Sequence, residues 1–478
     1  MKKIFITAVS VCLALVLSAC DAAYLNGAQR TADIVSSAPN VQSSKTSSIE
    51  FDLDAYIAKK EGTEDEDSTA SDRVRGKIFD RNGSVLVYSE PNGEQEYIRL
   101  FDEDYAEAVA PFVSDVSNGV DCVNAKTMRK PNNTSTPNDC GRSIKLTLDA
   151  DLQLKIYRLM CEKNAVGSVV IMDKNGAVIC AVSTPSYDPN RYGSDPSYAA
   201  EINKAANTPL ICKANEKRTP GSTFKMISCT LAKKYGYTTY FDRGSLEVNG
   251  QTIKNWDHDA AYYPVERDLR SLFFNSSNTG FAYVFMNTSK DRITTDCKNM
   301  FLLGDNIDFE CDFAALHNDL KLTDIARSGF GQSDVKLSPM YTAMLAILTA
   351  TGEMPKPYCV AAEVNTLDCT DVIEERKIGD PLSTIEYKLR EPTVLGMQDI
   401  AENLGLSVSV KGANIYAKTG TAEFDSVQNT LWIAGYISLS EKSGYAVVLQ
   451  IRNPDDLGFE YASDMREIYQ EILNDAFK

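Results

Sequence analysis

The sequence predicts a mixed α+β (or α/β) fold: an antiparallel sheet flanked by helices, with a helical subdomain and a small N-terminal domain that contains β-strands. Apolar runs on either side of an Asn-Gly pair predict β-hairpins at 75–90 and 167–185. Two more strand patterns, at 430–438 and 445–451, precede a helical pattern at 464–477. A long, mainly helical stretch separates the two groups of strands. Because the strands come from both ends of this unit, we expect them to form one sheet that helices bracket.

Length and composition limit the classes of protein to which this chain can belong. Its 478 residues, 43% of them apolar, can bury a sizeable core and form more than one folded unit. The net charge of −17 argues against nucleic acid or an anionic lipid surface as a partner. No C-x-x-C pair occurs, and the two histidines, His258 and His317, have no ligand-like neighbours. We therefore expect no metal site and no cofactor.

The first residues have the pattern of an export signal. Two lysines precede a mostly apolar run at 4–19, which is somewhat short for a membrane-spanning helix. The run ends in Leu-Ser-Ala-Cys, which resembles a bacterial lipobox and predicts cleavage and lipidation at Cys20. The alternative is that residues 1–20 are an uncleaved membrane anchor. Both interpretations place the rest of the chain outside the cytoplasm, where residues 21–74, polar and then strongly acidic, are predicted to be a flexible tether.

Two folded regions are expected after the tether. The first, 75–146, is predicted to be a small non-catalytic domain that begins with a type I′ hairpin at Asn82-Gly83. The second, 147–478, begins with a helical pattern for which Asp149 is the expected N-cap.

The cysteines allow two interpretations. Ten of the twelve lie after the export signal, and an even number outside the cytoplasm permits disulfides. Cys161, Cys180 and Cys229, however, lie in apolar, patterned segments, so we expect these three to be buried as small hydrophobic side chains.

A candidate nucleophile lies in the stretch RTPGSTFKMISC. Pro220-Gly221 is a turn signal, and a helix is expected to run from Ser222 to Gly236, with Lys225 one turn after Ser222 on the same face. Unpaired N–H groups at a helix start can hold an oxyanion, and a desolvated lysine near another cation can act as a neutral base. The motif alone is weak evidence, since a serine at a helix start is usually only an N-cap.

Two later motifs supply what this pair lacks. Ser276-Ser277-Asn278 lies between two helical patterns, and the stretch Lys418-Thr419-Gly420-Thr421 begins a strand pattern. Taken singly, the first could be an ordinary turn and the second the end of a strand. Their order, spacing and element types together predict one site that combines a nucleophile, a base, a hydroxyl, an amide and a second cation.

With these motifs the chain resembles class B penicillin-binding proteins, the transpeptidase-only members of the penicillin-recognising serine enzymes. The stretches RGKIFDRNGSVL, LTLDADLQL, VVIMDKNGAVICAVSTPSYDPN and GFGQSDVKLSPMYTAMLAI are also similar to segments of this family. Ser333 stands where a further glycine is common. The resemblance covers most of the chain, and implies the penicillin-binding transpeptidase fold and a peptidoglycan D,D-transpeptidase that β-lactams inactivate.

The resemblance also implies the chemical roles. Ser222 would attack the carbonyl of the penultimate D-alanine of a stem peptide and form an acyl-enzyme, with Lys225 as the base. Ser276 would pass a proton to the departing D-alanine nitrogen. Asn278 would hold Lys225 and a substrate amide.

For substrate binding, the resemblance implies roles for the third motif. Lys418 would keep Lys225 neutral and attract the terminal carboxylate of the substrate. The hydroxyls of Thr419 and Thr421, on either side of Gly420, would bind this carboxylate. The backbone N–H groups of Ser222 and Thr421 would bind the oxyanion.

The implied partners are an acyl-D-Ala-D-Ala donor, an amine acceptor on a second stem, β-lactams bound covalently, the membrane through the N-terminus, and glycosyltransferase or other wall-synthesis proteins. The implied location is the extracytoplasmic face of the bacterial cell membrane. Two alternatives stay open at this point. One is a D,D-carboxypeptidase or β-lactamase on the same scaffold, and the other is a non-catalytic β-lactam sensor or scaffold.

Overall fold

The structure, a computed structural model, describes residues 73–92, 97–114, 116, 119–132, 140–257, 260–304, 312–313, 322–333, 335–424 and 428–477. All of them belong to one compact unit, 67–478. The predicted export signal with Cys20, almost all of the predicted tether, and both histidines lie outside the described residues. Within the ranges described, no helix is both long and apolar enough to cross a membrane.

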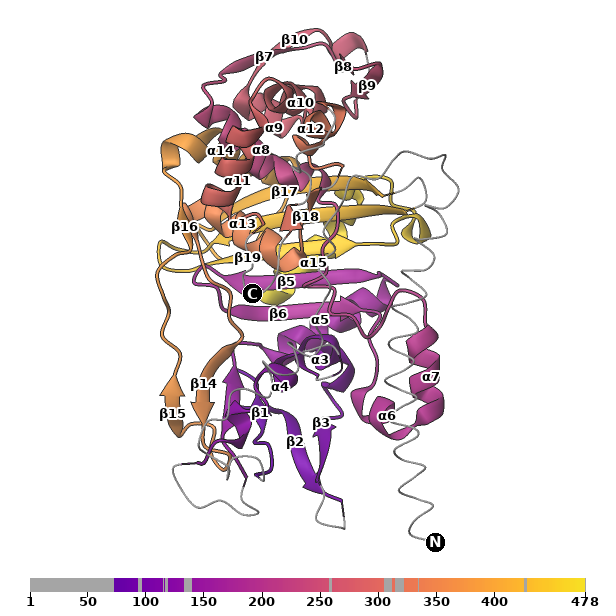
Figure 1. The fold of residues 1–478 in the computed structure, drawn as a ribbon, viewed down its shortest axis with the longest axis vertical. Coiled ribbons are helices and arrows are strands. Elements are labelled where there is room, and N and C mark those ends of the chain that lie inside the picture. The colour runs from indigo at the N-terminus through magenta and orange to yellow at the C-terminus, as the bar shows by residue number, and fades with distance from the viewer. Residues whose placement is uncertain are drawn as a thin grey trace, which may run out of the picture. The chain divides into compact units, whose positions relative to one another are not determined.

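A five-stranded antiparallel sheet forms the centre of the fold, in the order β17-β18-β19-β5-β6 (Figure 1). Its strands are β5 (Gly167–Asp173), β6 (Val178–Thr184), β17 (Asn414–Phe424), β18 (Gln428–Ser438) and β19 (Gly444–Ile451). The last strand from the C-terminal group, β19, pairs with β5 from the other end of the unit. This confirms the predicted sheet and its assembly from both ends of the chain.

Helices cover both faces of this sheet. On one face, α5 (Ala150–Glu162) and α15 (Arg466–Ala476) pack against it through an apolar cluster that includes Ile156 and Ile472. On the other face lie α8 (Lys225–Lys234), α13 (Pro339–Thr351) and α14 (Tyr387–Asn403). The helix α13 is buried along almost its whole length, which explains why its sequence is apolar on every side. The mixed α+β fold is therefore confirmed.

A helical subdomain lies at the β17 end of the sheet (Figure 1). Its helices are α9 (Leu269–Phe274), α10 (Asn278–Met286), α11 (Lys290–Phe301) and α12 (Leu322–Ser328). Two small antiparallel pairs accompany them: β7 (Thr239–Asp242) with β10 (Val265–Asp268), and β8 (Ser245–Val248) with β9 (Gln251–Lys254). These pairs matter for the site because β9 leads directly into a segment that contacts the start of α10.

A second, six-stranded sheet has the order β15-β14-β4-β1-β2-β3. Its strands are β1 (Ile78–Phe79), β2 (Val85–Pro91), β3 (Tyr97–Phe101), β4 (Ser143–Leu146), β14 (Val360–Val364) and β15 (Val372–Glu375). Two of these strands come from beyond residue 146. The boundary between 75–146 and 147–478 stays a proposal, and the sheet shows that strands from both sides of it pair with each other.

Shorter elements complete the described chain. The helices are α3 (Ala106–Val113), α4 (Val120–Val123), η2 (Thr127–Arg129), α6 (Pro189–Ser194), α7 (Pro196–Lys204), η5 (Ala260–Tyr262), η7 (Asp455–Leu457) and η8 (Ala462–Met465). The strand pairs are β11 (Asp312–Phe313) with β12 (Val335–Lys336) and β13 (Glu353–Met354) with β16 (Ser383–Thr384).

The N-terminal hairpin forms as predicted, but its turn differs. Strands β1 and β2 pair antiparallel around Asn82-Gly83. Gly83 has a φ of +99°, whereas Asn82 does not have a positive φ, so the predicted type I′ turn is wrong. The physical reason is Asp80, whose carboxylate accepts the backbone N–H groups of Asn82 and Ser84, both at 2.8 Å, and so fixes a different turn.

One helix cap and three cysteines were also predicted from the sequence. Asp149 is the N-cap of α5 and accepts the backbone N–H of Leu152 at 3.1 Å, which confirms the predicted helix start. Cys180 and Cys229 are fully buried, as predicted. Cys161 is exposed, so the prediction for this residue is wrong, because it lies on the solvent side of the amphipathic helix α5.

We predict that Arg390→Met lowers the free energy of unfolding by about 2–4 kcal/mol. Arg390, on α14, is 9% exposed and donates to the carbonyls of Thr349, Ala350 and Thr351 at the end of α13. Without the guanidinium these three carbonyls, buried or partly buried, lose their donor. Urea unfolding measures the change, and Lys388→Ala, at an exposed position of the same helix, is the control with an expected loss below about 0.5 kcal/mol. Equal losses in the two variants would contradict this role.

Candidate active site

Ser222 lies in a 3₁₀ turn, η4 (Gly221–Phe224), that runs directly into α8. The predicted single helix therefore begins as this tighter turn. Gly221 has a φ of +53°, and its N–H donates to the carbonyl of Gly331 at 3.0 Å. A Cβ on Gly331 would lie 1.9 Å from the carbonyl oxygen of Gly221, so only glycine allows this contact. Ser333, two residues later, has a φ of +67°, a conformation that glycine adopts more easily.

Lys225, the first residue of α8, is fully buried and its Nζ is the centre of the site. Its Nζ lies 2.8 Å from Ser222 Oγ, and it donates to the carbonyl of Ser276 at 2.7 Å and to Asn278 Oδ1 at 2.7 Å. Ser276 Oγ lies 3.2 Å away. The first and second sequence motifs thus meet at one amine.

The Ser276-Ser277-Asn278 turn joins α9 to α10. Ser277 is the N-cap of α10, and its hydroxyl accepts the N–H of Gly280 at 3.0 Å. Ser276 has a φ of +53°, an uncommon conformation for serine. Since such a residue needs surrounding contacts to keep its conformation, the turn must be held by groups outside it.

The third motif lies on β17, beside the Ser222 turn. Lys418 Nζ donates to Ser276 Oγ at 3.1 Å and to the carbonyl of Thr419 at 2.8 Å. A Cβ on Gly420 would come within 2.8 Å of the carbonyl oxygen of Pro220 and 3.0 Å of the backbone nitrogen of Thr223. Glycine at 420 therefore lets η4 pack directly against β17. Thr419 and Thr421, each partly exposed, lie on either side of it on the same strand.

Burial sets the charge state of the two lysines. Burial, and next the positive charge of Lys418, hold the pKa of Lys225 well below its ordinary value. Burial alone lowers the pKa of Lys418 to about 7. Among the described residues, no carboxylate forms an ion pair with either amine. A neutral Lys225 has a lone pair and can take the Ser222 proton across 2.8 Å.

The structure brings Ser222, Lys225, Ser276, Asn278 and Lys418 into one hydrogen-bonded cluster, with Thr419, Gly420 and Thr421 beside it. Two aromatic rings that we did not predict also face the amines. Phe273 lies 5.5 Å from Lys418 Nζ, and Phe330 lies 5.9 Å from Lys225 Nζ. Phe273 lies just before the Ser276-Ser277-Asn278 motif, and Phe330 lies in the family-like stretch GFGQSDVKLSPMYTAMLAI. Nothing in the sequence distinguishes either residue from a phenylalanine of the hydrophobic core.

The rate at which Ser222 reacts should rise with pH as Lys225 loses its proton, and we call this part of the pH profile the rising limb. We predict that Lys418→Met moves the rising limb to higher pH. Removing the neighbouring cation raises the pKa of Lys225, so that less of it is neutral at a given pH and the reaction slows several-fold below neutral pH. The rate of Ser222 modification by a fluorophosphonate, measured against pH, gives the limb. Lys418→Arg keeps the charge and should keep the limb where it is. A limb unchanged in Lys418→Met would show that the two amines are not coupled.

Comparison with known proteins points to one family. The family model described as the penicillin-binding protein transpeptidase domain matches residues 167–475. Penicillin-binding protein 3 of Bacillus subtilis is 26% identical over 344 residues, which cover 66% of this chain and 49% of that protein. Peptidoglycan D,D-transpeptidase PbpA of Mycolicibacterium smegmatis is 25% identical, with 77% of this chain and 81% of that protein covered. The chain spans about half the length of the first of these relatives.

A solved structure shows the same fold. Penicillin-binding protein A from M. tuberculosis, as its penicillin G acyl-enzyme complex, superposes with a TM-score of 0.74 at 20% sequence identity. The superposition covers 84% of this chain and 99% of the other. The chain therefore belongs to the penicillin-binding protein transpeptidase family, and the class B resemblance of its motifs is confirmed.

Proposed function

We propose that this protein is a peptidoglycan D,D-transpeptidase that cross-links stem peptides through an acyl-enzyme on Ser222. The single observation that carries the proposal is the contact of 2.8 Å between Ser222 Oγ and the fully buried Nζ of Lys225. A nucleophile beside an uncharged amine is suited to acyl transfer near neutral pH. The family supports the choice of reaction, since the similar PbpA protein is itself named a peptidoglycan D,D-transpeptidase.

In the acylation step, Ser222 Oγ attacks the carbonyl carbon of the penultimate D-alanine while Lys225 takes its proton. The backbone N–H groups of Ser222 and Thr421 bind the resulting oxyanion. Collapse of this intermediate breaks the peptide bond and releases the terminal D-alanine. Its nitrogen receives a proton through the hydroxyl of Ser276, which lies within 3.2 Å of both lysine amines.

Substrate binding is assigned to the groups around this centre. Lys418 attracts the terminal carboxylate of the donor, and the hydroxyls of Thr419 and Thr421 bind it. Asn278 holds Lys225 through Oδ1 and faces an amide of the stem. Gly420 keeps the strand close to the Ser222 turn.

The acyl-enzyme then has two possible acceptors, an amine of a second stem or water. Attack by the amine makes the cross-link, whereas fast attack by water would make the protein a carboxypeptidase or β-lactamase. Rapid hydrolysis needs a base that activates the water. Among the described residues, no carboxylate bonds to Ser222, Lys225, Ser276 or Lys418, which favours the transpeptidase over the hydrolases.

The proposal includes the place of action and the partners. Cell-wall synthesis takes place outside the cytoplasm, and we propose attachment to the membrane through a lipidated Cys20 or an N-terminal helix. The donor is an acyl-D-Ala-D-Ala stem and the acceptor an amine. β-Lactams resemble the donor and acylate Ser222, and glycosyltransferase or other wall-synthesis proteins are the proposed protein partners.

A fluorescent penicillin tests the function directly. We predict a labelled band that persists for many minutes after a chase with unlabelled drug, because no carboxylate among the described residues bonds to the site and could activate water. The band should be absent in Ser222→Ala. Gel fluorescence measures the label, and circular dichroism checks the fold of the variant. Rapid loss of label would point to a hydrolase instead, and no label on folded wild-type protein would overturn the enzyme.

Lys225→Ala tests the base separately. We predict that acylation by penicillin slows by several orders of magnitude, because Ser222 then has no neighbouring proton acceptor. Stopped-flow fluorescence gives the rate, and the thermal midpoint checks that the fold survives. Near-normal acylation of a folded Lys225→Ala protein would mean that another group is the base.

A further inference from the structure

The segment Lys254–Trp256, which begins at the last residue of β9, contacts the Ser276-Ser277-Asn278 turn on several sides. We propose that Asn255 is a positioning residue that holds this turn in its reactive geometry, with Asp242 as its buried anchor. This inference rests on the proposed function, because it concerns how the amine of Lys225 is kept in place beside Ser222.

Asn255 is 1% exposed and bonds to the first residues of α10. Its Oδ1 accepts the backbone N–H of Asn278 at 2.8 Å and that of Thr279 at 3.1 Å. The first N–H groups of a helix have no partner within the helix, and here a side chain supplies one. The N-cap Ser277 serves Gly280, and Asn255 serves the two residues before it.

Asp242, at the end of β7, accepts hydrogen bonds both from Asn255 and from the start of α10. It is fully buried and accepts Asn255 Nδ2 at 3.0 Å. It also accepts the hydroxyls of Ser277 and Thr279, both at 2.8 Å. The middle residue of the second motif therefore points away from the reaction centre and into a buried network, which fixes the direction of the residues on either side.

The residues on either side of Asn255, Lys254 and Trp256, also bond to the Ser276 turn and its flanking residues. Trp256 donates its indole N–H to the carbonyl of Asn275 at 3.1 Å, and the carbonyl of Lys254 accepts Asn278 Nδ2 at 3.0 Å. Because the NH₂ end of the Asn278 amide is bound on that side, its oxygen must face Lys225. The orientation that places Asn278 Oδ1 at 2.7 Å from Lys225 Nζ is thus set by the backbone of this segment.

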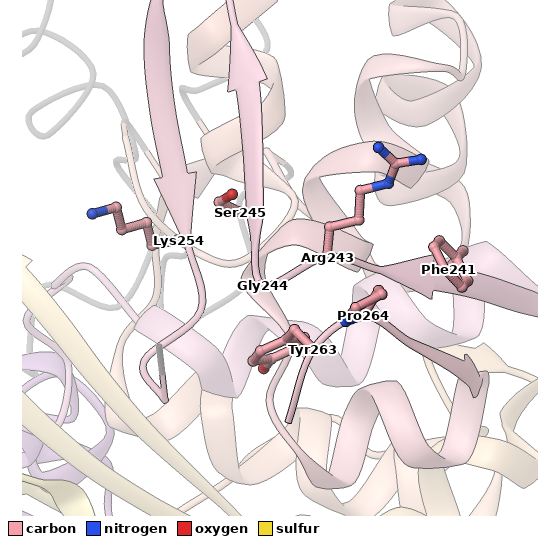
Figure 2. A pocket seen from close by; sticks show the side chains of 7 residues that line it. All are labelled: Phe241, Arg243, Gly244, Ser245, Lys254, Tyr263 and Pro264. Atoms are coloured by element: carbon pink, nitrogen blue, oxygen red, sulfur yellow. The ribbon is translucent and has the colours of Figure 1, made fainter. Parts of the chain in front are cut away.

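The first residue of the segment, Lys254, borders a pocket of about 580 Å³ (Figure 2). Lys254 and Tyr263 line this pocket. The Tyr263 ring packs closely against Gly244, because a Cβ on that glycine would lie only 2.8 Å from the ring. Tyr263 Oη accepts Asn255 Nδ2 at 3.0 Å. Asn255 Nδ2 therefore donates to both Asp242 and Tyr263, and these two bonds fix the orientation of the buried amide.

The consequence for the reaction is geometric. The turn supplies the carbonyl of Ser276, its hydroxyl and Asn278 Oδ1, which are three of the four contacts of Lys225 Nζ. Ser276 keeps its φ of +53° only while the turn is held. Loss of the Asn255 bonds lets these atoms shift, and a shift of about 1 Å in a reactive group can cost about 100-fold in rate.

The first test is Asn255→Ala, with Asn190→Ala as the matched control. The Asn190 carboxamide likewise bonds to backbone, accepting from and donating to Phe101 at 2.8 Å in each case, but on the other sheet. We expect Ser222 modification by a fluorophosphonate to slow about 10- to 100-fold in Asn255→Ala and less than about twofold in Asn190→Ala. Equal rates for folded Asn255→Ala and wild type would overturn the inference. Penicillin labelling of the wild type, run in parallel, tests the proposed function independently of this ratio.

A second variant, Asn255→Asp, decides the matter even where the alanine variant does not fold. Aspartate keeps an acceptor for the two helix N–H groups but places a second carboxyl against Asp242, near Tyr263, Asp257 and Arg267. At low pH a shared proton replaces the lost donor, and at higher pH the two charges repel. The rate relative to wild type should therefore approach one at low pH and fall as pH rises. A ratio that does not change with pH would contradict a positioning role.

Discussion

Two buried lysine amines share one serine hydroxyl, and the rest of the site depends on this arrangement. Ser276 Oγ lies 3.2 Å from Lys225 Nζ and 3.1 Å from Lys418 Nζ, and both side chains are fully buried. Burying two like charges without a carboxylate partner is costly, so at least one amine is driven to its neutral form. That neutral amine is the base that the nucleophile Ser222 needs.

The scaffold keeps the two amines together by joining three separate elements. The Ser222 turn approaches β17 through Gly420, and the Ser276 turn is held against Lys225 by the segment after β9. The five-stranded sheet carries β17, and α8 carries Lys225, with α14 packed against both. A change in any of these contacts reaches the reaction centre by moving one amine relative to the other.

Much of the fold and of the site could be predicted from the sequence, because the patterns that indicate them involve residues close together in the chain. Hairpins at Asn-Gly pairs, the cap at Asp149 and the order of the three motifs are readable from neighbouring residues. The pairing of β14 with β4 has no such signal, since it joins residues more than 200 positions apart. Asn255 was missed for the same reason: a single asparagine in a loop has no pattern, and its importance comes only from the helix start against which it folds.

The most direct measurement of the central claim is an NMR titration of the lysine side chains, labelled with ¹³C at Cε and assigned with Lys225→Arg and Lys418→Arg. We predict that Lys225 titrates well below the ordinary lysine pKa and that Lys418 titrates with a pKa of about 7. Near neutral pH the Lys225 signal should then be that of an uncharged amine. If both amines titrate near the ordinary value of 10.5, Lys225 is charged at neutral pH and cannot be the base.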